Sequence, residues 1–83
     1  MTTAIATRAT ELLVEMFRID PPHIVKEASL REDLDLDSID TIDLLSKLNQ
    51  EFSLELTPFD FLDCKSLGDF LNRLEEKQRG APA

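Results

Sequence analysis

The chain has 83 residues, enough for one domain with a modest core and too few for a deep catalytic cleft. Seventeen acidic and nine basic residues give a formal net charge of −8. That charge argues against nucleic acid and anionic membranes as partners and favours basic protein surfaces. The single cysteine excludes an internal disulfide, and no segment has the pattern of a leader or a membrane span. We therefore expect a cytoplasmic monomer.

Apolar residues spaced by three and four predict a first helix over residues 3–17, with Thr2 or Thr3 as its cap. Pro21-Pro22 cannot continue it, so the helix should end near Arg18 or Ile19. Residues 19–37 then form a connection that is long for a small domain and needs anchors in the core to stay ordered. The candidate anchors are Ile19, Ile24, Val25, Ala28, Leu30 and Leu34.

Residues 38–52 predict a second helix with two distinct faces. A helical wheel places apolar residues and one threonine on the core side: Thr41, Leu44, Leu45, Leu48 and Phe52. The opposite side carries Ile39, Asp43, Ser46 and Gln50. An isoleucine therefore lies on the polar face, directly after Ser38.

The last third of the chain contains two helix-start signals. Thr57-Pro58 opens a short helix through Leu62, and Ser66 with Asp69 approximates a capping box for a final helix that ends near Glu76 or Lys77. The expected fold is all-α, with three main helices, one short helix and a long loop between the first and second helices. Residues 1–78 should form a single domain, followed by a flexible tail over residues 79–83.

The most informative segment surrounds Ser38, where six acidic residues fall within residues 32–43. Asp37 and Ser38 could simply be an N-cap pair, with acidic groups that complement the helix dipole. That interpretation does not explain the outward isoleucine or the density of carboxylates. A serine displayed among carboxylates is poorly placed to act as a nucleophile and well placed to be modified by a basic enzyme.

Two chemical alternatives lack the residues that they need. Asp33, Asp35 and Asp37 are spaced like the first ligands of an EF-hand, but Ser38 and Leu44 stand where the loop requires glycine and glutamate. We expect no specific metal site, although weak divalent binding by Glu32, Asp37 and Asp40 stays open.

Catalysis by Ser38 would need an oriented base and an oxyanion site. The single histidine, His23, follows two prolines, and no glycine near Ser38 can build a nucleophile elbow. His23 should be a solvated loop residue and Cys64 a small core residue. We therefore expect that the protein is not an enzyme.

Asp37-Ser38-Ile39-Asp40 resembles the Asp-Ser-Leu signature of acyl carrier proteins, and the likeness runs over residues 5–76. It includes Glu32-Asp33-Leu34 before the motif and Glu51-Phe52 at the end of the second helix. The resemblance implies that a phosphopantetheinyl transferase, with Mg²⁺, moves 4′-phosphopantetheine from coenzyme A to Ser38. The arm would carry acyl intermediates as thioesters for a fatty-acid- or polyketide-type pathway.

The resemblance also implies partners and a docking surface. The partners would be the transferase and acyl-transferring or chain-extending enzymes, such as a ketosynthase, an acyl ligase or an acyltransferase. They would contact Asp37, Ile39, Asp40, Asp43 and Ser46, with the aspartates for steering and Ile39 for apolar contact. Leu48, Phe61, Leu62 and Leu71 are the expected lining of an interior that shelters the acyl chain.

Several positions depart from the pattern of fatty-acid carriers. Asp35 replaces a glycine, Ser46 replaces an apolar residue, Lys47 adds a positive charge, and Asn49 and Gln50 replace acids. Aspartate tolerates the backbone angles of glycine better than most residues, so the turn should survive. With these residues the sequence resembles specialised carriers, such as those encoded in aryl polyene clusters. The alternatives are a stand-alone aminoacyl or peptidyl carrier and an unmodified acidic adaptor in which Ser38 is only a cap.

Overall fold

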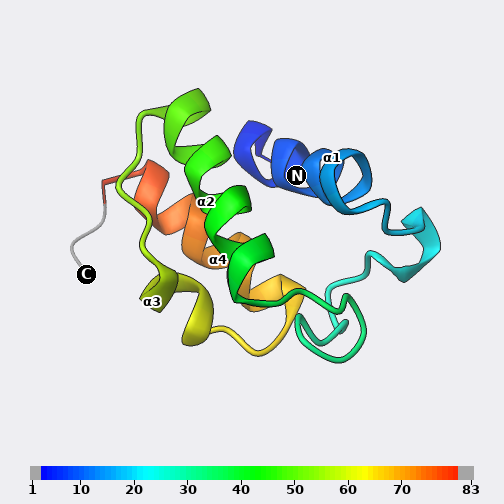
Figure 1. The fold of residues 1–83 in the computed structure, drawn as a ribbon. Helices are drawn as coiled ribbons and strands as arrows, with labels where there is room; N and C mark the ends of the chain where they lie inside the picture. The colour runs from blue at the N-terminus through cyan, green and yellow to red at the C-terminus, as the bar shows by residue number, and fades with distance from the viewer. Residues whose placement is uncertain (1–2, 81–83) are drawn as a thin grey trace.

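The computed structural model describes residues 3–80, and these form a helical bundle (Figure 1). Its elements are α1 (Ala4–Phe17), a short 3₁₀ turn η1 (Pro21–His23), α2 (Ser38–Phe52), α3 (Pro58–Leu62) and α4 (Leu67–Gln78). The described chain has no β-strand, only an isolated bridge between Ser29 and Ser66. The predicted all-α fold, with three longer helices and one short one, is confirmed.

The helix ends follow the capping signals in the sequence. Thr3 Oγ1 accepts a hydrogen bond from the Ala6 N–H at 3.3 Å, which makes Thr3 the cap of α1. At the start of α4 the Asp69 N–H donates to Ser66 Oγ at 3.2 Å, and the Ser66 N–H donates to Asp69 Oδ2 at 3.4 Å. The helix continues to Gln78, one or two residues beyond the predicted end. Of the predicted tail, residues 81–83 lie outside the described part of the chain.

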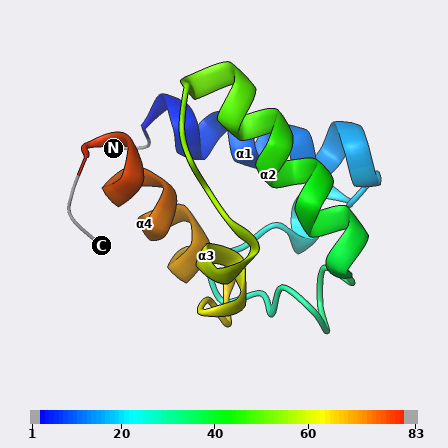
Figure 2. The same ribbon diagram turned by 60° about the vertical axis from the view of Figure 1, so that its left-hand side comes forward.

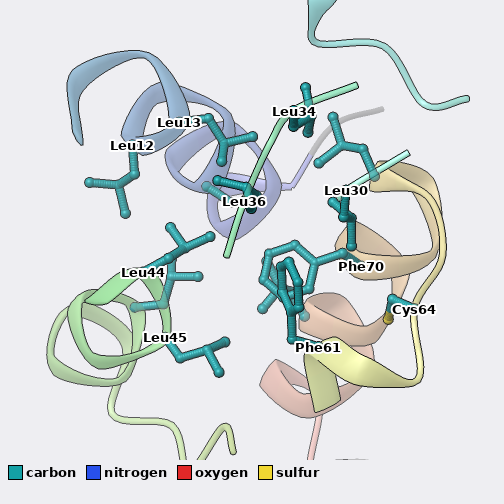
Figure 3. Packing of buried hydrophobic residues seen from close by; sticks show 14 of the residues in the cluster. Leu12, Leu13, Leu30, Leu34, Leu36, Leu44, Leu45, Phe61, Cys64 and Phe70 are labelled. Atoms are coloured by element: carbon teal, nitrogen blue, oxygen red, sulfur yellow. The ribbon is translucent and has the colours of Figure 1, made fainter. Parts of the chain in front are cut away.

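The core is built mainly from leucine side chains of α1, α2, α4 and the long loop, and α3 contributes Phe61 (Figure 3). Phe61 of α3 and Phe70 of α4 meet edge to face, with ring centroids 5.2 Å apart. The predicted core face of α2 is confirmed, because Thr41, Leu44, Leu45 and Leu48 are buried and Phe52 packs against them partly exposed. Helix α2 packs on α1 and α3, and α4 also packs on α1 and α3 (Figure 2).

The long loop between α1 and α2 is ordered by two kinds of contact. Ala28, Leu30 and Leu34 are buried as predicted, and Leu36 joins them. Val25 is 46% exposed, so its predicted anchoring role is wrong. Val25 lies directly before the turn at residues 26–27. Nearby, the carbonyl oxygens of Lys26 and Ala28 accept hydrogen bonds from the start of α4.

Backbone hydrogen bonds join the loop to the start of α4. The Leu30 N–H donates to Lys65 O at 3.2 Å, the Leu67 N–H to Ala28 O at 2.9 Å, and the Gly68 N–H to Lys26 O at 2.9 Å. A Cβ at position 68 would lie 3.3 Å from that carbonyl oxygen, which explains the glycine in a helical segment. The loop is therefore a packed part of the fold that ends at Ser38.

Candidate functional site

The last turn of the loop folds back on itself before it reaches Ser38. Asp33 Oδ2 accepts the Ser29 N–H at 2.8 Å, and the Leu36 N–H donates to Leu30 O at 3.1 Å. Asp35 has φ of +53°, a left-handed conformation that L-residues rarely adopt and that aspartate tolerates better than most. The expectation that Asp35 can take the place of a glycine is confirmed. This turn sets the direction in which the chain enters α2.

Helix α2 is capped by Asp37 and begins with Ser38. Asp37 Oδ1 accepts the Asp40 N–H at 2.8 Å, and Asp40 Oδ2 accepts the Asp37 N–H at 3.4 Å, which completes a capping box. The Thr41 hydroxyl donates to Asp37 O at 2.8 Å. Ser38 is exposed, and among the described residues its hydroxyl has no hydrogen-bond partner. Asp37 and Asp40 therefore form the cap, and the interpretation of the Ser38 side chain as part of it is wrong.

A hollow of about 290 Å³ opens beside Ser38, between α2, α3 and the end of the long loop. We call it the Ser38 groove, and it is lined by Arg31, Leu36, Asp37, Ser38, Thr41, Ile42, Pro58, Phe61 and Leu62. Of the four residues expected to line a sheltering interior, Phe61 and Leu62 also line this groove. Leu48 lies in the core and Leu71 is partly buried against it.

Sequence reasoning missed Arg31, Leu36, Ile42 and Pro58 as lining residues. Ile42 gave a signal, because it follows Ile39 by three and therefore extends the same exposed side of the helix. Arg31 gave none, since only the fold-back of the loop places it beside Ser38.

The α3 wall of the groove is held by Asp60, which is 6% exposed. Its carboxylate accepts the Thr57 N–H at 2.9 Å and a hydrogen bond from Arg73 Nη1 at 3.0 Å, and Lys77 Nζ lies 3.6 Å away. Burial alone raises the pKa of Asp60, but the Thr57 N–H, Arg73 and Lys77 together bring that pKa below its ordinary value. Asp60 thus joins α3 to α4 as a buried ionised group.

Cys64 follows α3 and is buried, as predicted for a small core residue. Its thiol donates to Asp60 O at 3.2 Å, and burial raises the pKa of that thiol. A buried, protonated cysteine of this kind is a poor nucleophile.

The proposed docking residues lie on the exposed side of α2, with one qualification for Asp40. Ile39 is 70% exposed, and Asp37, Asp43 and Ser46 are exposed as well. Asp40 is half-buried, with one carboxylate oxygen engaged in the capping box. Two further apolar side chains were missed: Ile42, 54% exposed, and Phe59, 73% exposed at the start of α3. The surface around Ser38 is thus both acidic and apolar.

Other candidate groups do not come together with Ser38. His23 is exposed in η1 and is absent from the lining of the Ser38 groove. Within residues 3–80 no cluster of three or more histidine, cysteine or acidic side chains is arranged to hold a metal ion. Over the same span no helix is both long enough and apolar enough to cross a membrane.

The geometry at Ser38 fits a phosphate ester on its hydroxyl. The N–H groups of Ser38 and Ile39 have no acceptor among the described residues, and they lie at the positive end of a 15-residue helix. Such a helix start stabilises a phosphate through free N–H groups and the dipole. The exposed hydroxyl leaves room for attachment, and the mainly apolar groove beside it offers a surface to whatever is attached. Within residues 3–80 no side chain accepts a hydrogen bond from the Ser38 hydroxyl, and His23 does not line the groove.

Comparisons with known proteins show the family to which the chain belongs. Residues 8–74 match the family model described as the phosphopantetheine attachment site. The chain is 37% identical over 73 residues to acyl carrier protein 2 of Ralstonia nicotianae, which covers 88% of this chain and 90% of that protein. It is 34% identical over 74 residues to an acyl carrier protein of Bdellovibrio bacteriovorus, and this match covers 89% of this chain and 95% of that protein. The chain therefore belongs to the acyl carrier protein family, and its prosthetic group is a covalently attached 4′-phosphopantetheine.

Proposed function

We propose that Ser38 is the attachment residue and that the protein shuttles acyl intermediates in a fatty-acid- or polyketide-type pathway, without catalysis of its own. The observation that supports the attachment residue best is the free, exposed hydroxyl of Ser38 at the first position of α2. Asp37 occupies the N-cap position and its side chain caps the helix, so the Ser38 hydroxyl is left for modification.

The transfer needs little from the carrier itself. Ser38 Oγ forms a bond to the β-phosphorus of coenzyme A and loses its proton, and the adenosine bisphosphate half of coenzyme A leaves. The transferase supplies the base and the metal ion, while this chain contributes the docking surface and the orientation of the hydroxyl. When attached, the prosthetic group supplies the terminal thiol that holds the cargo as a thioester.

The Ser38 groove supports acyl cargo over aminoacyl cargo. Apolar side chains from three segments form most of its lining, among them Leu36, Ile42 and Leu62. An alkyl or polyene chain gains free energy when it leaves water for such a surface, whereas a charged ammonium group does not. A polyketide-type carrier for an apolar polyene is consistent with this lining.

The test is the intact mass of the protein after incubation with coenzyme A, Mg²⁺ and a phosphopantetheinyl transferase of broad specificity. We expect the mass to increase by one phosphopantetheine in the wild type and in Ser53→Ala, and to stay unchanged in Ser38→Ala. Ser53 is the control because it is an exposed serine at the other end of α2, outside the proposed docking residues. A mass increase in Ser38→Ala, or none in the wild type with several transferases, would contradict the proposal.

A further inference from the structure

The Ser38 groove contains one positive charge. Arg31 lines it together with Asp37 and Ser38, although it lies seven positions before the serine. The hydrogen bond from the Leu36 N–H to Leu30 O brings the two ends of this segment together, and buried Leu30, Leu34 and Leu36 hold them there. A packed turn therefore brings Arg31 to the hollow that Ser38 also lines.

Arg31 is also isolated in the sequence from other basic residues. It is the sole basic residue between Lys26 and Lys47, in a stretch that contains the six acids of residues 32–43. A phosphodiester on Ser38 adds a further negative charge to this stretch, next to Asp37 and Asp40. Like charges at such short range repel one another unless a positive group compensates. The dipole of α2 supplies part of that compensation.

The guanidinium of Arg31 is free to supply the remaining positive charge that compensates the phosphodiester. Among residues 3–80 it forms no ion pair, although acidic residues surround it in the sequence. Three carboxylates of this stretch accept backbone N–H groups: Asp33 accepts that of Ser29, and Asp37 and Asp40 accept each other's in the capping box. A guanidinium matches two phosphate oxygens at once, which a lysine ammonium does less well.

We propose that Arg31 is a positioning residue for the prosthetic group, and that it binds the phosphodiester on Ser38 and so directs the arm along the Ser38 groove. This proposal rests on the proposed attachment at Ser38. The unacylated arm carries no other negative charge, so any electrostatic coupling between Arg31 and the arm reports on the phosphodiester.

The experiment compares melting temperatures of the unmodified and modified forms of each variant, with modification verified by intact mass. We expect the change in melting temperature on modification to be less favourable by about 2 to 5 °C in Arg31→Gln than in the wild type at low salt. The difference should shrink at about 0.5 M NaCl, because salt screens exposed charges. Arg31→Lys should retain part of the wild-type behaviour.

Lys47→Gln is the matched control. It removes the same charge from the exposed side of α2, at a residue that does not line the groove. We expect it to behave as the wild type. The ³¹P resonance of the phosphodiester should move in Arg31→Gln and stay in place in Lys47→Gln.

Equal effects of modification in the wild type and in Arg31→Gln, with an unmoved ³¹P resonance, would overturn the role of Arg31 while attachment at Ser38 stands. Absence of any modification of the wild type would instead overturn the proposed attachment, and the role of Arg31 with it.

Discussion

Asp37 and Ser38 have different roles at the start of α2: Asp37 caps the helix, and Ser38 offers a free hydroxyl. The Asp37 carboxylate accepts the Asp40 N–H, and the Ser38 hydroxyl is left without a partner among the described residues. Replacement of Asp37 should therefore lower stability, whereas replacement of Ser38 should abolish attachment. The two variants together test the site.

Replacement of Asp37 by alanine removes the cap, and we expect the free energy of unfolding to fall by about 0.5–2 kcal/mol. Ser38→Ala removes no hydrogen bond within the protein, so its free energy of unfolding should stay within about 0.5 kcal/mol of the wild type. Urea unfolding followed by circular dichroism measures both. A loss in Ser38→Ala as large as that in Asp37→Ala would show that the serine takes part in the cap.

Ile39 can act as a docking contact only if its side chain is exposed. Because its side chain is largely exposed, Ile39→Glu should leave the fold intact. We expect the kcat/KM of the transferase with this variant as substrate to fall about tenfold, since loss of a central apolar contact typically costs an interface that much. Val25→Glu, which places the same charge at an exposed apolar residue of the long loop, should have little effect. Equal losses in both variants would point to net charge, and loss of helicity in Ile39→Glu would contradict the exposed position.

At the scale of elements, α3 is held to α4 by ionic contacts as well as by the packing of Phe61 on Phe70. It has five residues, too few for a helix to be stable alone, and its tie to α4 runs through Asp60, Arg73 and Lys77. Since Pro58, Phe61 and Leu62 of α3 form one wall of the Ser38 groove, these ionic contacts also keep the groove in shape.

The lowered pKa of Asp60 gives a pH dependence with a definite sign. A carboxyl group whose pKa is lower in the folded than in the unfolded state stabilises the fold above the unfolded value of about 3.9 and loses this effect as the pH falls. We expect Asp60→Asn to reduce the free energy of unfolding by about 1–3 kcal/mol at neutral pH. The gap between this variant and the wild type should narrow below about pH 4.

Asp63→Asn is the control for that experiment, because Asp63 is exposed and lies 3.9 Å from the same Arg73. An exposed pair of this kind contributes little, so the variant should stay within about 1 kcal/mol of the wild type. A gap between Asp60→Asn and the wild type that is the same at neutral and acidic pH would contradict an ionised Asp60 as the source of the stability.

At the scale of the whole molecule, the helices were predictable from the sequence because each carries an apolar stripe and a capping signal. Thr3, Pro58 and the Ser66–Asp69 pair mark helix starts that the structure confirms. The serine motif was equally predictable, since six acidic residues surround it at the start of an amphipathic helix. Local signals of this kind depend on neighbours within one or two turns, which the sequence displays directly.

The features that were missed arise from contacts between distant segments. The apolar side chain of Val25 predicts an anchor, but the loop is joined to α4 through backbone hydrogen bonds of Lys26 and Ala28 instead. Arg31 reaches Ser38 only because the turn over residues 29–36 closes on buried leucines. Asp60 is buried in an ionic contact with Arg73 and Lys77, which its position in a short helix does not predict.

The most direct test of the account is to map the attachment residue by fragmentation of the modified protein in a mass spectrometer. The chain has five serines, at positions 29, 38, 46, 53 and 66, and each is a separate possible outcome. The account predicts that the whole mass of the phosphopantetheine is found on Ser38, between Asp37 and Ile39. Its presence on any other residue would contradict the assignment of the helix start of α2 as the site of attachment.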